Sequence, residues 1–252
     1  MRALSILLIG LLLSAPAQAG LSRADIARVG VSLPPAARID PALAAPDAEG
    51  TRRRMGDILA GHPAFLIFVD YTCTTLCGTE LALLANALQR ARLGPSEMRI
   101  LVLGIDPRDE ASAARDMETK ELPPLLRSAA AFLLPDKATV AATTEALGFR
   151  YVFDEESDQF ANPAAIYLLS PKGRVTGVLS PFDLLTQDLR SRLSDASPSL
   201  YERVRLLCYG LDPATGLYNA RIATLLKSIA LLTLLLLGAA ILLFARGRRR
   251  VG

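Results

Sequence analysis

Two continuous apolar runs constrain the fold of this chain more than any other feature. They are AFLIFVDYT at residues 64–72 and MRILVLGID at residues 98–106, and a helix-like stretch at 78–93 separates them. Runs of this length that are rich in Ile, Val and Phe are typical of strands buried on both faces. Their alternation with a helix predicts a parallel α/β core.

The remaining elements predict a mixed sheet. The acidic turn Pro107-Arg108-Asp109-Glu110 is expected to open a second helix, with Asp106 and Asp109 acting as capping residues. Further on, the pattern predicts an apolar segment at 129–134, a helix at 137–147 that ends at Gly148, strands at 149–153, 164–169 and 174–179, and a last helix at 182–193. A turn at 171–173 makes the last two strands antiparallel. This order predicts a thioredoxin-like α/β fold, in which helices flank a mixed central sheet.

Both ends of the chain carry targeting patterns. Residues 1–19 combine Arg2, a short apolar core and the small-residue exit Ala17-Gln18-Ala19, so we expect a signal peptide that is cleaved after Ala19. Residues 228–245 form an uncharged apolar run, which predicts one C-terminal transmembrane helix. The arginine-rich tail at 246–252 marks the cytoplasmic end. We therefore expect the rest of the chain on the exported side, in the periplasm of a bacterium, anchored to the cytoplasmic membrane.

The distribution of charge agrees with this topology. The chain has 28 Lys and Arg residues against 25 Asp and Glu residues, for a net charge of +3. Arg2 and the four tail arginines supply five of those positive charges, so the part between them is mildly acidic. An acidic body disfavours a nucleic-acid-binding domain.

These patterns divide the chain into six parts. The division is a signal peptide at 1–19, an N-terminal arm and hairpin at 20–60, a thioredoxin-like domain at 61–196, a juxtamembrane segment at 197–227, a transmembrane helix at 228–245 and a cytoplasmic basic tail at 246–252. Within the arm, residues 34–46 are rich in Ala and Pro. The run Arg52-Arg53-Arg54 is expected to be one strand of a surface hairpin.

The strongest chemical signal is the pair Cys73 and Cys77, spaced as CxxxC where the first buried strand gives way to a helix. The N-terminus of a helix favours anions, so a thiol placed there ionises more readily. Thiolates attack disulfides and bind soft metals. The pair is therefore expected to exchange with disulfides or to hold one soft ion, and an inert structural disulfide is the remaining alternative.

Four segments together resemble one family. FVDYTCTTLC, VLGIDPRDE, LGFRYVFD and AAIYLLSPKGRV occur in this order within residues 32–195 and are similar to the Sco/SenC family of membrane-anchored, thioredoxin-fold assembly factors. The resemblance implies copper handling, or thiol reduction, during assembly of the binuclear copper site of cytochrome oxidase. The implied partner is the oxidase subunit that carries this site, or its assembly factors. In the family, two CxxxC sulfurs and a distant His bind copper, and Cys73 and Cys77 match the sulfurs.

The chain departs from the family at the histidine, because Asn162 occupies the ligand position. An amide is a hard, weak ligand for Cu(I). The single histidine, His62, precedes the first strand, does not match the family ligand and is expected at the surface. Thr74 and Gly78 also replace prolines that are usual beside the family cysteines. These departures favour thiol–disulfide exchange, with a Cu(I) chaperone using a ligand other than His, or a purely docking member, as alternatives.

Two accessory hypotheses follow from the missing histidine. Asn162 and Pro163 can face the cysteine pair across a cis peptide bond, as in many thioredoxin folds, or Pro163 can be an ordinary trans proline. Cys208 can act as a third soft ligand or a resolving thiol, or it can be a small buried residue.

Acidic residues near the cysteines complete the set of candidates. Asp70 can accept a proton if it is buried, and the acidic run at 154–158 is expected to be a solvated loop that can steer a basic partner.

Overall fold

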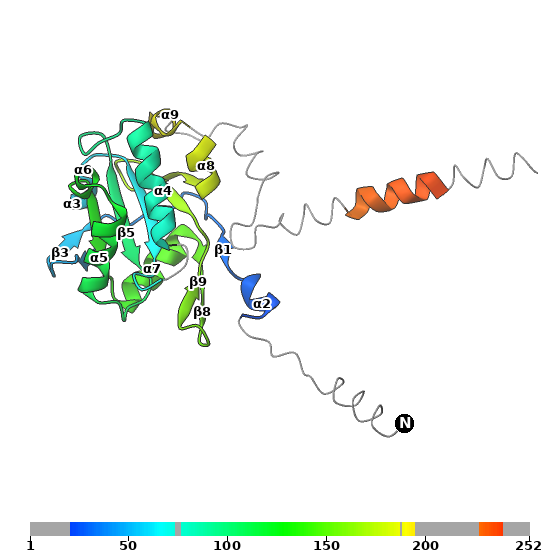
Figure 1. Cartoon of the computed structure of the whole chain (residues 1–252), viewed down its shortest axis with the longest axis horizontal. Coiled ribbons are helices and arrows are strands. Elements are labelled where there is room, and N and C mark those ends of the chain that lie inside the picture. The colour runs from blue at the N-terminus through cyan, green and yellow to red at the C-terminus, as the bar shows by residue number, and fades with distance from the viewer. Residues whose placement is uncertain (1–20, 74–76, 187, 195–226, 239–252) are drawn as a thin grey trace, which may run out of the picture.

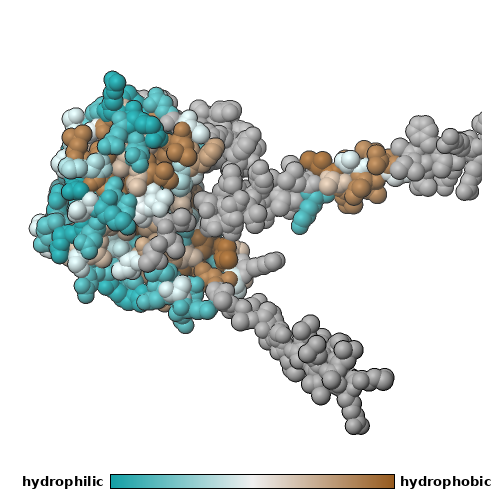
Figure 2. Space-filling view, in the orientation of Figure 1, coloured by the Kyte–Doolittle hydropathy of each residue, from teal (hydrophilic) through white to brown (hydrophobic). Residues whose placement is uncertain are grey.

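The structure is a computed structural model that describes residues 21–73, 77–186, 188–194 and 227–238. The predicted signal peptide, Cys208 and the basic tail lie outside these residues. Residues 227–238 form a helix that Figure 2 colours as mainly hydrophobic, in contrast to the mainly hydrophilic visible face of the domain. Among the described residues, no helix combines the length and the hydropathy needed to cross a membrane.

A five-stranded sheet forms the centre of the domain, in the order β11-β10-β4-β5-β6 (Figure 1). The strands are β4 (Ala64–Val69), β5 (Arg99–Gly104), β6 (Ala130–Leu133), β10 (Ile166–Leu169) and β11 (Val175–Leu179). β4 runs parallel to β5, and β5 runs parallel to β6. β10 is antiparallel to both β4 and β11. The predicted α/β class, the mixed sheet and the antiparallel last pair are confirmed.

Helices cover both faces of this sheet (Figure 1). One core contains residues from α4 (Cys77–Arg90), α5 (Ala111–Glu121), α6 (Pro124–Arg127), α8 (Pro181–Thr186) and α9 (Leu189–Ser194). The core on the other face contains residues from α3 (Met55–Leu59) and α7 (Lys137–Leu147). All six residues of β4 are buried, because their side chains alternate between the two cores.

Three elements differ from the predictions. The strand expected at 149–153 divides into β7 (Phe149–Arg150), which pairs with β1 (Gly30–Val31), and β8 (Val152–Asp154), which pairs with β9 (Gln159–Ala161). The buried ring of Phe149 packs against Phe68 and Tyr167, whereas the residues after it leave the body as a hairpin. The last helix is divided into α8 and α9, and α5 begins at Ala111, later than expected.

The N-terminal arm packs on the domain. After the short helix α2 (Arg23–Ile26), the side chain of Ile39 is buried, and its backbone N–H donates to the Gly173 carbonyl at 2.9 Å. β2 (Ala44–Pro46) and β3 (Arg52–Arg54) form an antiparallel hairpin with the three arginines exposed, which confirms the predicted surface hairpin.

Gly148 provides a test of how the arm is held. It ends α7 in the left-handed conformation, and its carbonyl accepts a hydrogen bond from the Ser32 N–H at 2.8 Å. A Cβ on residue 148 would lie 2.0 Å from the Ser32 carbonyl oxygen. We expect Gly148→Ala to lower the free energy of unfolding by at least about 2 kcal/mol in denaturant titrations, because backbone strain and a clash add together.

Gly50→Ala is the matched control. Gly50 also has a positive φ, but no atom lies within 4 Å of the position of its Cβ. This substitution therefore carries the conformational cost alone, about 1 kcal/mol. Equal losses for the two variants would contradict the importance of the contact with Ser32.

Candidate functional site

Cys73 and Cys77 lie at the carboxyl end of β4. β4 ends at Val69, Cys73 follows four residues later, and Cys77 is the first residue of α4. Cys73 is half-buried and Cys77 is only 3% exposed. Neither forms a disulfide bond, and their side chains share a hydrogen bond. The predicted position at the switch from strand to helix is confirmed, with one thiol facing solvent more than the other.

The environment of Cys77 disfavours its thiolate. The hydrogen bond with Cys73, followed by burial, raises the pKa of Cys77 far above its usual range. For Cys77, these effects outweigh the helix N-terminus, which was expected to promote ionisation. The two sulfurs therefore differ in accessibility.

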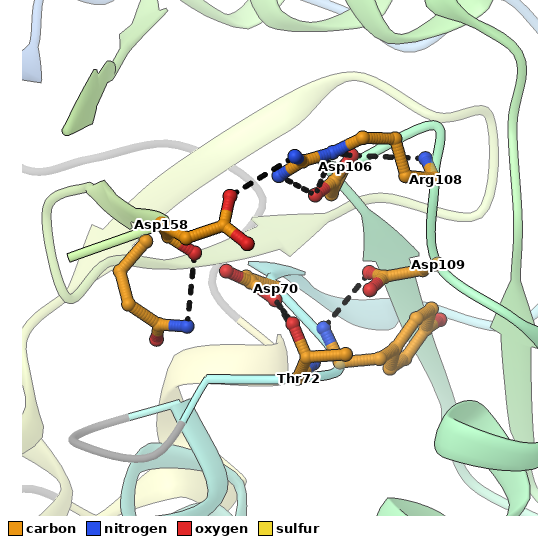
Figure 3. Close-up of polar contacts among 8 residues, drawn as sticks. Asp70, Thr72, Asp106, Arg108, Asp109 and Asp158 are labelled. Atoms are coloured by element: carbon orange, nitrogen blue, oxygen red, sulfur yellow. Dashed lines mark hydrogen bonds and ion pairs between the residues drawn. The ribbon is translucent and has the colours of Figure 1, made fainter. Parts of the chain in front are cut away.

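Asp70 shapes the turn before Cys73 (Figure 3). Its Oδ1 accepts hydrogen bonds from the Thr72 backbone N–H at 2.9 Å and from the Thr72 hydroxyl at 2.8 Å. The Asp70 carbonyl also accepts a bond from the Cys73 N–H at 3.1 Å. Burial raises the pKa of Asp70, but its Oδ1 is occupied by the turn. Asp70 thus holds the turn through one carboxyl oxygen, and its burial meets the condition on which a proton-accepting role was predicted.

Asp109 does not cap a helix, so that prediction is wrong. Its Oδ2 accepts a bond from the Tyr71 backbone N–H at 2.9 Å, which joins the ends of β4 and β5 (Figure 3). Its Oδ1 is buried and has no hydrogen-bond partner among the described residues, and burial raises the pKa of Asp109 to about 6. Glu110 is the N-cap residue of α5, and its side chain makes no capping hydrogen bond.

Arg108 connects this region to the β8–β9 hairpin. It binds Asp106, with Nη2 to Oδ2 at 2.6 Å, and its Nη1 lies 3.0 Å from Oδ1 of Asp158 (Figure 3). Its guanidinium also lies 5.0 Å from the centre of the Phe153 ring. Asp106 is therefore an ion-pair partner and does not cap α5, which corrects the prediction made for it. The acidic run forms the turn of the hairpin, and Asp158 is its attachment point.

Asn162 and Pro163 precede β10, on the side of the sheet where the cysteines follow β4. β10 is antiparallel to β4, with Ile166 opposite Ile67 and Leu169 opposite Ala64, so the residues before Ile166 lie toward the carboxyl end of β4. No cis peptide bond occurs in the described part of the chain, so the bond before Pro163 is trans and the cis hypothesis is wrong. Asn162 is half-buried.

His62 lies at the opposite end of β4. It precedes Ala64, the first residue of the strand, whereas the cysteines follow the last residue. A six-residue strand spans roughly 20 Å, so His62 cannot meet either sulfur. Within the described ranges, no group of three or more His, Cys, Asp or Glu side chains is arranged to hold a metal ion. The two sulfurs suit a soft ion such as Cu(I), but no described His, Asp, Glu or further Cys completes a group of three metal-binding side chains with them.

The sequence prediction missed Glu80. This glutamate is 4% exposed, and its Oε1 has no hydrogen-bond partner among the described residues. Burial raises the pKa of Glu80 to about 8. The available signal was its position, because residue 80 falls on the same helical stripe as the buried Cys77, Leu81 and Leu84.

Glu121 occupies the space that Gly78 leaves open. A Cβ on Gly78 would lie 2.8 Å from Oε1 of Glu121, the last residue of α5. Gly78 therefore leaves room for a carboxylate against the first turn of α4.

Glu80 predicts a specific dependence of stability on pH. Its carboxyl binds a proton more tightly in the folded state, with a pKa of about 8, than in the unfolded chain, where the value is near 4.5. The stabilisation from that proton is complete below about pH 4.5 and is lost as the pH rises to about 8, with a slope of up to ~1.4 kcal/mol per pH unit. We expect the wild-type free energy of unfolding to fall relative to that of Glu80→Gln across this range.

The measurement is chemical denaturation of both proteins between about pH 5 and 9. Glu145→Gln, on the exposed face of α7, is the control and is expected to follow the wild type. A constant difference between wild type and Glu80→Gln throughout the range would contradict a buried carboxyl that titrates near pH 8.

Comparisons with known proteins agree with this geometry. The SCO1/SenC family profile matches residues 34–195. A search of curated proteins gave no match.

Three solved structures share the fold. A SCO1/SenC family lipoprotein from Bacillus anthracis is 15% identical, with a TM-score of 0.51 over 71% of this chain and 99% of that protein. Yeast Sco1 with copper bound is 15% identical, with a TM-score of 0.51 over 68% and 94%. BsSco, described as having a disulfide switch, is 20% identical, with a TM-score of 0.50 over 64% and 96%. The thioredoxin-like fold is confirmed, and because the family match covers more than half of its residues, this chain belongs to the SCO1/SenC family.

Proposed function

We propose that this protein assists assembly of the cytochrome oxidase copper site by thiol–disulfide exchange at Cys73 and Cys77. The family implies a role in copper delivery or oxidase assembly. The observation that favours exchange is the arrangement of two thiols, one half-buried and one buried, joined by a hydrogen bond at the end of β4. BsSco, a Sco-family relative of the same fold, is described as having a disulfide switch and as belonging to the cytochrome c oxidase assembly proteins.

The difference in exposure assigns a role to each sulfur. The accessible Cys73 thiolate attacks one sulfur of a client disulfide, and the other client sulfur leaves as a thiolate. Cys77, deprotonated, then attacks the Cys73 sulfur and displaces the second client thiolate, so that Cys73 and Cys77 become a disulfide. Two electrons pass to the client, whose thiolates are protonated from water. An external dithiol restores the two thiols by the reverse exchange.

Reduction of the client is a chemical requirement of copper insertion. A copper site with cysteine ligands needs thiolates, and an oxidising compartment converts these to a disulfide. The proposed client is the oxidase subunit that carries the binuclear copper site, or one of its assembly factors.

The topology belongs to the same proposal. Export by residues 1–19 and anchoring by a helix at 228–245 would hold the domain at the periplasmic face of a bacterial membrane, with the tail at 246–252 in the cytoplasm. An anchor favours action on a membrane-embedded client, because it confines both proteins to one surface.

A Cu(I) chaperone is the second candidate. Two sulfurs close enough to share a hydrogen bond can hold one Cu(I) ion as cargo, and the yeast Sco1 of similar fold has a structure with copper bound. The third ligand would have to be a group other than His, such as Cys208, which lies outside the described residues. The absence of a suitable third ligand among the described residues favours exchange as the first candidate.

One pair of measurements separates the candidates. The full chain in detergent micelles is equilibrated with dithiothreitol buffers to obtain the Cys73–Cys77 reduction potential, and the reduced chain is titrated with Cu(I) against a competing chelator. We expect a two-electron transition that Cys73→Ser and Cys77→Ser both abolish, together with weak copper binding. Cys208→Ser is expected to leave both results unchanged.

Other outcomes would replace the first candidate. Tight, stoichiometric copper that requires both cysteines would establish the chaperone, and a loss of copper affinity in Cys208→Ser would identify its third ligand. If the chain shows neither copper binding nor a redox transition, a docking role is the remaining candidate.

Asn162→His tests the position of the missing ligand. The substitution adds an imidazole at the cysteine end of the sheet, where β10 enters beside β4. We expect Cu(I) affinity to rise by at least about tenfold, or ~1.4 kcal/mol, because imidazole binds copper far better than an amide. Glu145→His on α7 is the control and is expected to leave the affinity unchanged. Equal affinities for wild type and Asn162→His would contradict the placement of residue 162 beside the sulfurs.

A further inference from the structure

The side of α8 that points away from the core is apolar. Outside residues 227–238, the described part of the chain exposes four large apolar side chains, which are Leu33, Leu125, Phe182 and Leu185. Phe182 is 67% exposed and Leu185 is 60% exposed, whereas Leu184 is buried. Residues three apart on a helix share a face, so Phe182 and Leu185 form one apolar ridge. Figure 2 shows hydrophobic surface in the area of α8.

A groove continues this ridge toward α4. Its volume is about 310 Å³, and the apolar part of its lining comes from three helices: Ala87 and Ala91 of α4, Leu184 and Leu185 of α8, and Leu189 of α9. The ridge and the groove together are called the α8 face below. Contiguous apolar surface of this kind marks a place where another body binds.

Arginines lie beside the α8 face. Arg90, Arg92 and Arg190 are exposed, and Arg190 donates to the Arg92 carbonyl at 3.0 Å. Such side chains can lay their apolar stems along a lipid surface while the guanidinium groups reach the headgroups.

The carboxylates in the same area have partners inside the domain. Glu97 pairs with Arg190 at 2.6 Å, and Asp188 accepts a bond from the Arg190 backbone N–H at 3.1 Å. Asp183 accepts bonds from the backbone N–H and the hydroxyl of Ser180, both at 2.9 Å. Because both signs of charge are present, apolar contact has to supply most of the attraction at this face.

The course of the chain indicates what covers the α8 face. Leu189, in the lining of the groove, is the first residue of α9, and α9 ends at Ser194. Residues 195–226 then lead to the apolar helix at 227–238, which is part of the proposed anchor at 228–245. The domain is therefore tethered from the corner that carries the α8 face. A tether raises the effective concentration of this face at the membrane, so a small apolar contact is sufficient.

We propose that the α8 face lies on the surface of the lipid bilayer that holds the chain's own anchor, an inference that rests on the proposed topology. Phe182 and Leu185 enter the boundary between headgroups and acyl chains, as aromatic and aliphatic side chains of interfacial helices do. The arginines stay at the level of the headgroups.

This contact orients the cysteine pair. α4 begins at Cys77 and ends at Arg90, whose Nη2 donates to the Leu184 carbonyl at 2.8 Å, so α8 lies at the far end of α4. A helix of 14 residues is about 21 Å long. The bilayer thus contacts the end of α4 opposite the thiols, which leaves Cys73 open to a client domain outside the membrane.

The test uses the absence of tryptophan from the sequence, because a single substituted Trp then reports on one place. Phe182→Trp and Leu125→Trp are each prepared in the full chain and reconstituted into phosphatidylcholine vesicles with plain or brominated acyl chains. Bromine quenches only a fluorophore that reaches the acyl region. We expect brominated lipid to lower the emission of Phe182→Trp by at least about twofold and to leave that of Leu125→Trp unchanged.

Leu125 is the matched control position. It is 66% exposed, nearly the same as Phe182, but it belongs to α6. α6 packs against β6, and α8 packs against β11, at the opposite edge of the sheet.

A second substitution separates docking of the domain from insertion of the anchor. Leu185→Asp in the Phe182→Trp chain places a charge on the α8 face, and we expect quenching to fall to the level of Leu125→Trp. Leu33→Asp in the same background changes another exposed leucine and is expected to leave quenching intact. If Leu185→Asp does not fold by circular dichroism, Leu185→Ser takes its place.

Each outcome decides for or against the proposal. If the chain floats with the vesicles but Phe182→Trp is not quenched by bromine, docking is overturned while the topology stands. If the emission is blue-shifted in plain vesicles without bromine quenching, protein covers the face, and docking is again overturned. A shift that grows with the protein-to-lipid ratio then identifies a second copy, and a constant shift identifies another segment of this chain. A chain that does not float with the vesicles contradicts the topology and the docking together.

Discussion

The complete burial of β4 is the constraint on which the rest of the structure depends. The strand is hydrogen-bonded along both edges, to β5 and to β10, and is covered on both faces, so polar groups of its sequence are confined to its ends. At the carboxyl end, the Tyr71 hydroxyl lies 3.0 Å from the carbonyls of Val102 and Leu133, which anchors the turn to the next two strands. The cysteines therefore follow a turn that is anchored to the sheet by Tyr71. Gly104 makes room for this anchor, because a Cβ at residue 104 would lie 2.8 Å from the Tyr71 ring.

The sequence was most informative where structure is set by local pattern. The continuous apolar runs predicted the buried strands β4 and β5, and the helix-like stretch after the first run predicted α4. The positions of Cys73 and Cys77 after β4 and at the start of α4 were also predicted. It failed where a side chain finds a partner far along the chain. Asp109 accepts a bond from Tyr71, 38 residues away, and Arg108 meets Asp158, 50 residues away, and no local rule predicts either pair. Capping is the expected role of an acid before a helix, and here tertiary contacts take precedence over it.

Carboxyl groups, rather than an imidazole, surround the cysteine end of this family member. Asp70 holds the turn, Glu80 lies in the core behind Cys77, and Glu121 lies against Gly78. Burial raises the pKa values of Asp70 and Glu80, so these two carboxyls keep their protons to higher pH than exposed ones do.

The antiparallel insertion of β10 between β4 and β11 also determines when the site becomes complete. Ile67 and Ile166 are opposite one another in the sheet although nearly one hundred residues of chain separate them, and contacts of such long range form slowly because a large loop must close first. Cys73 follows β4 and Cys77 begins α4, whereas Asn162 precedes β10 and takes its place only when the last strands have paired. A chain that is interrupted before β10 would thus carry both sulfurs and lack the antiparallel strand that pairs with β4, so the cysteine pair and the completed sheet are separable products of folding.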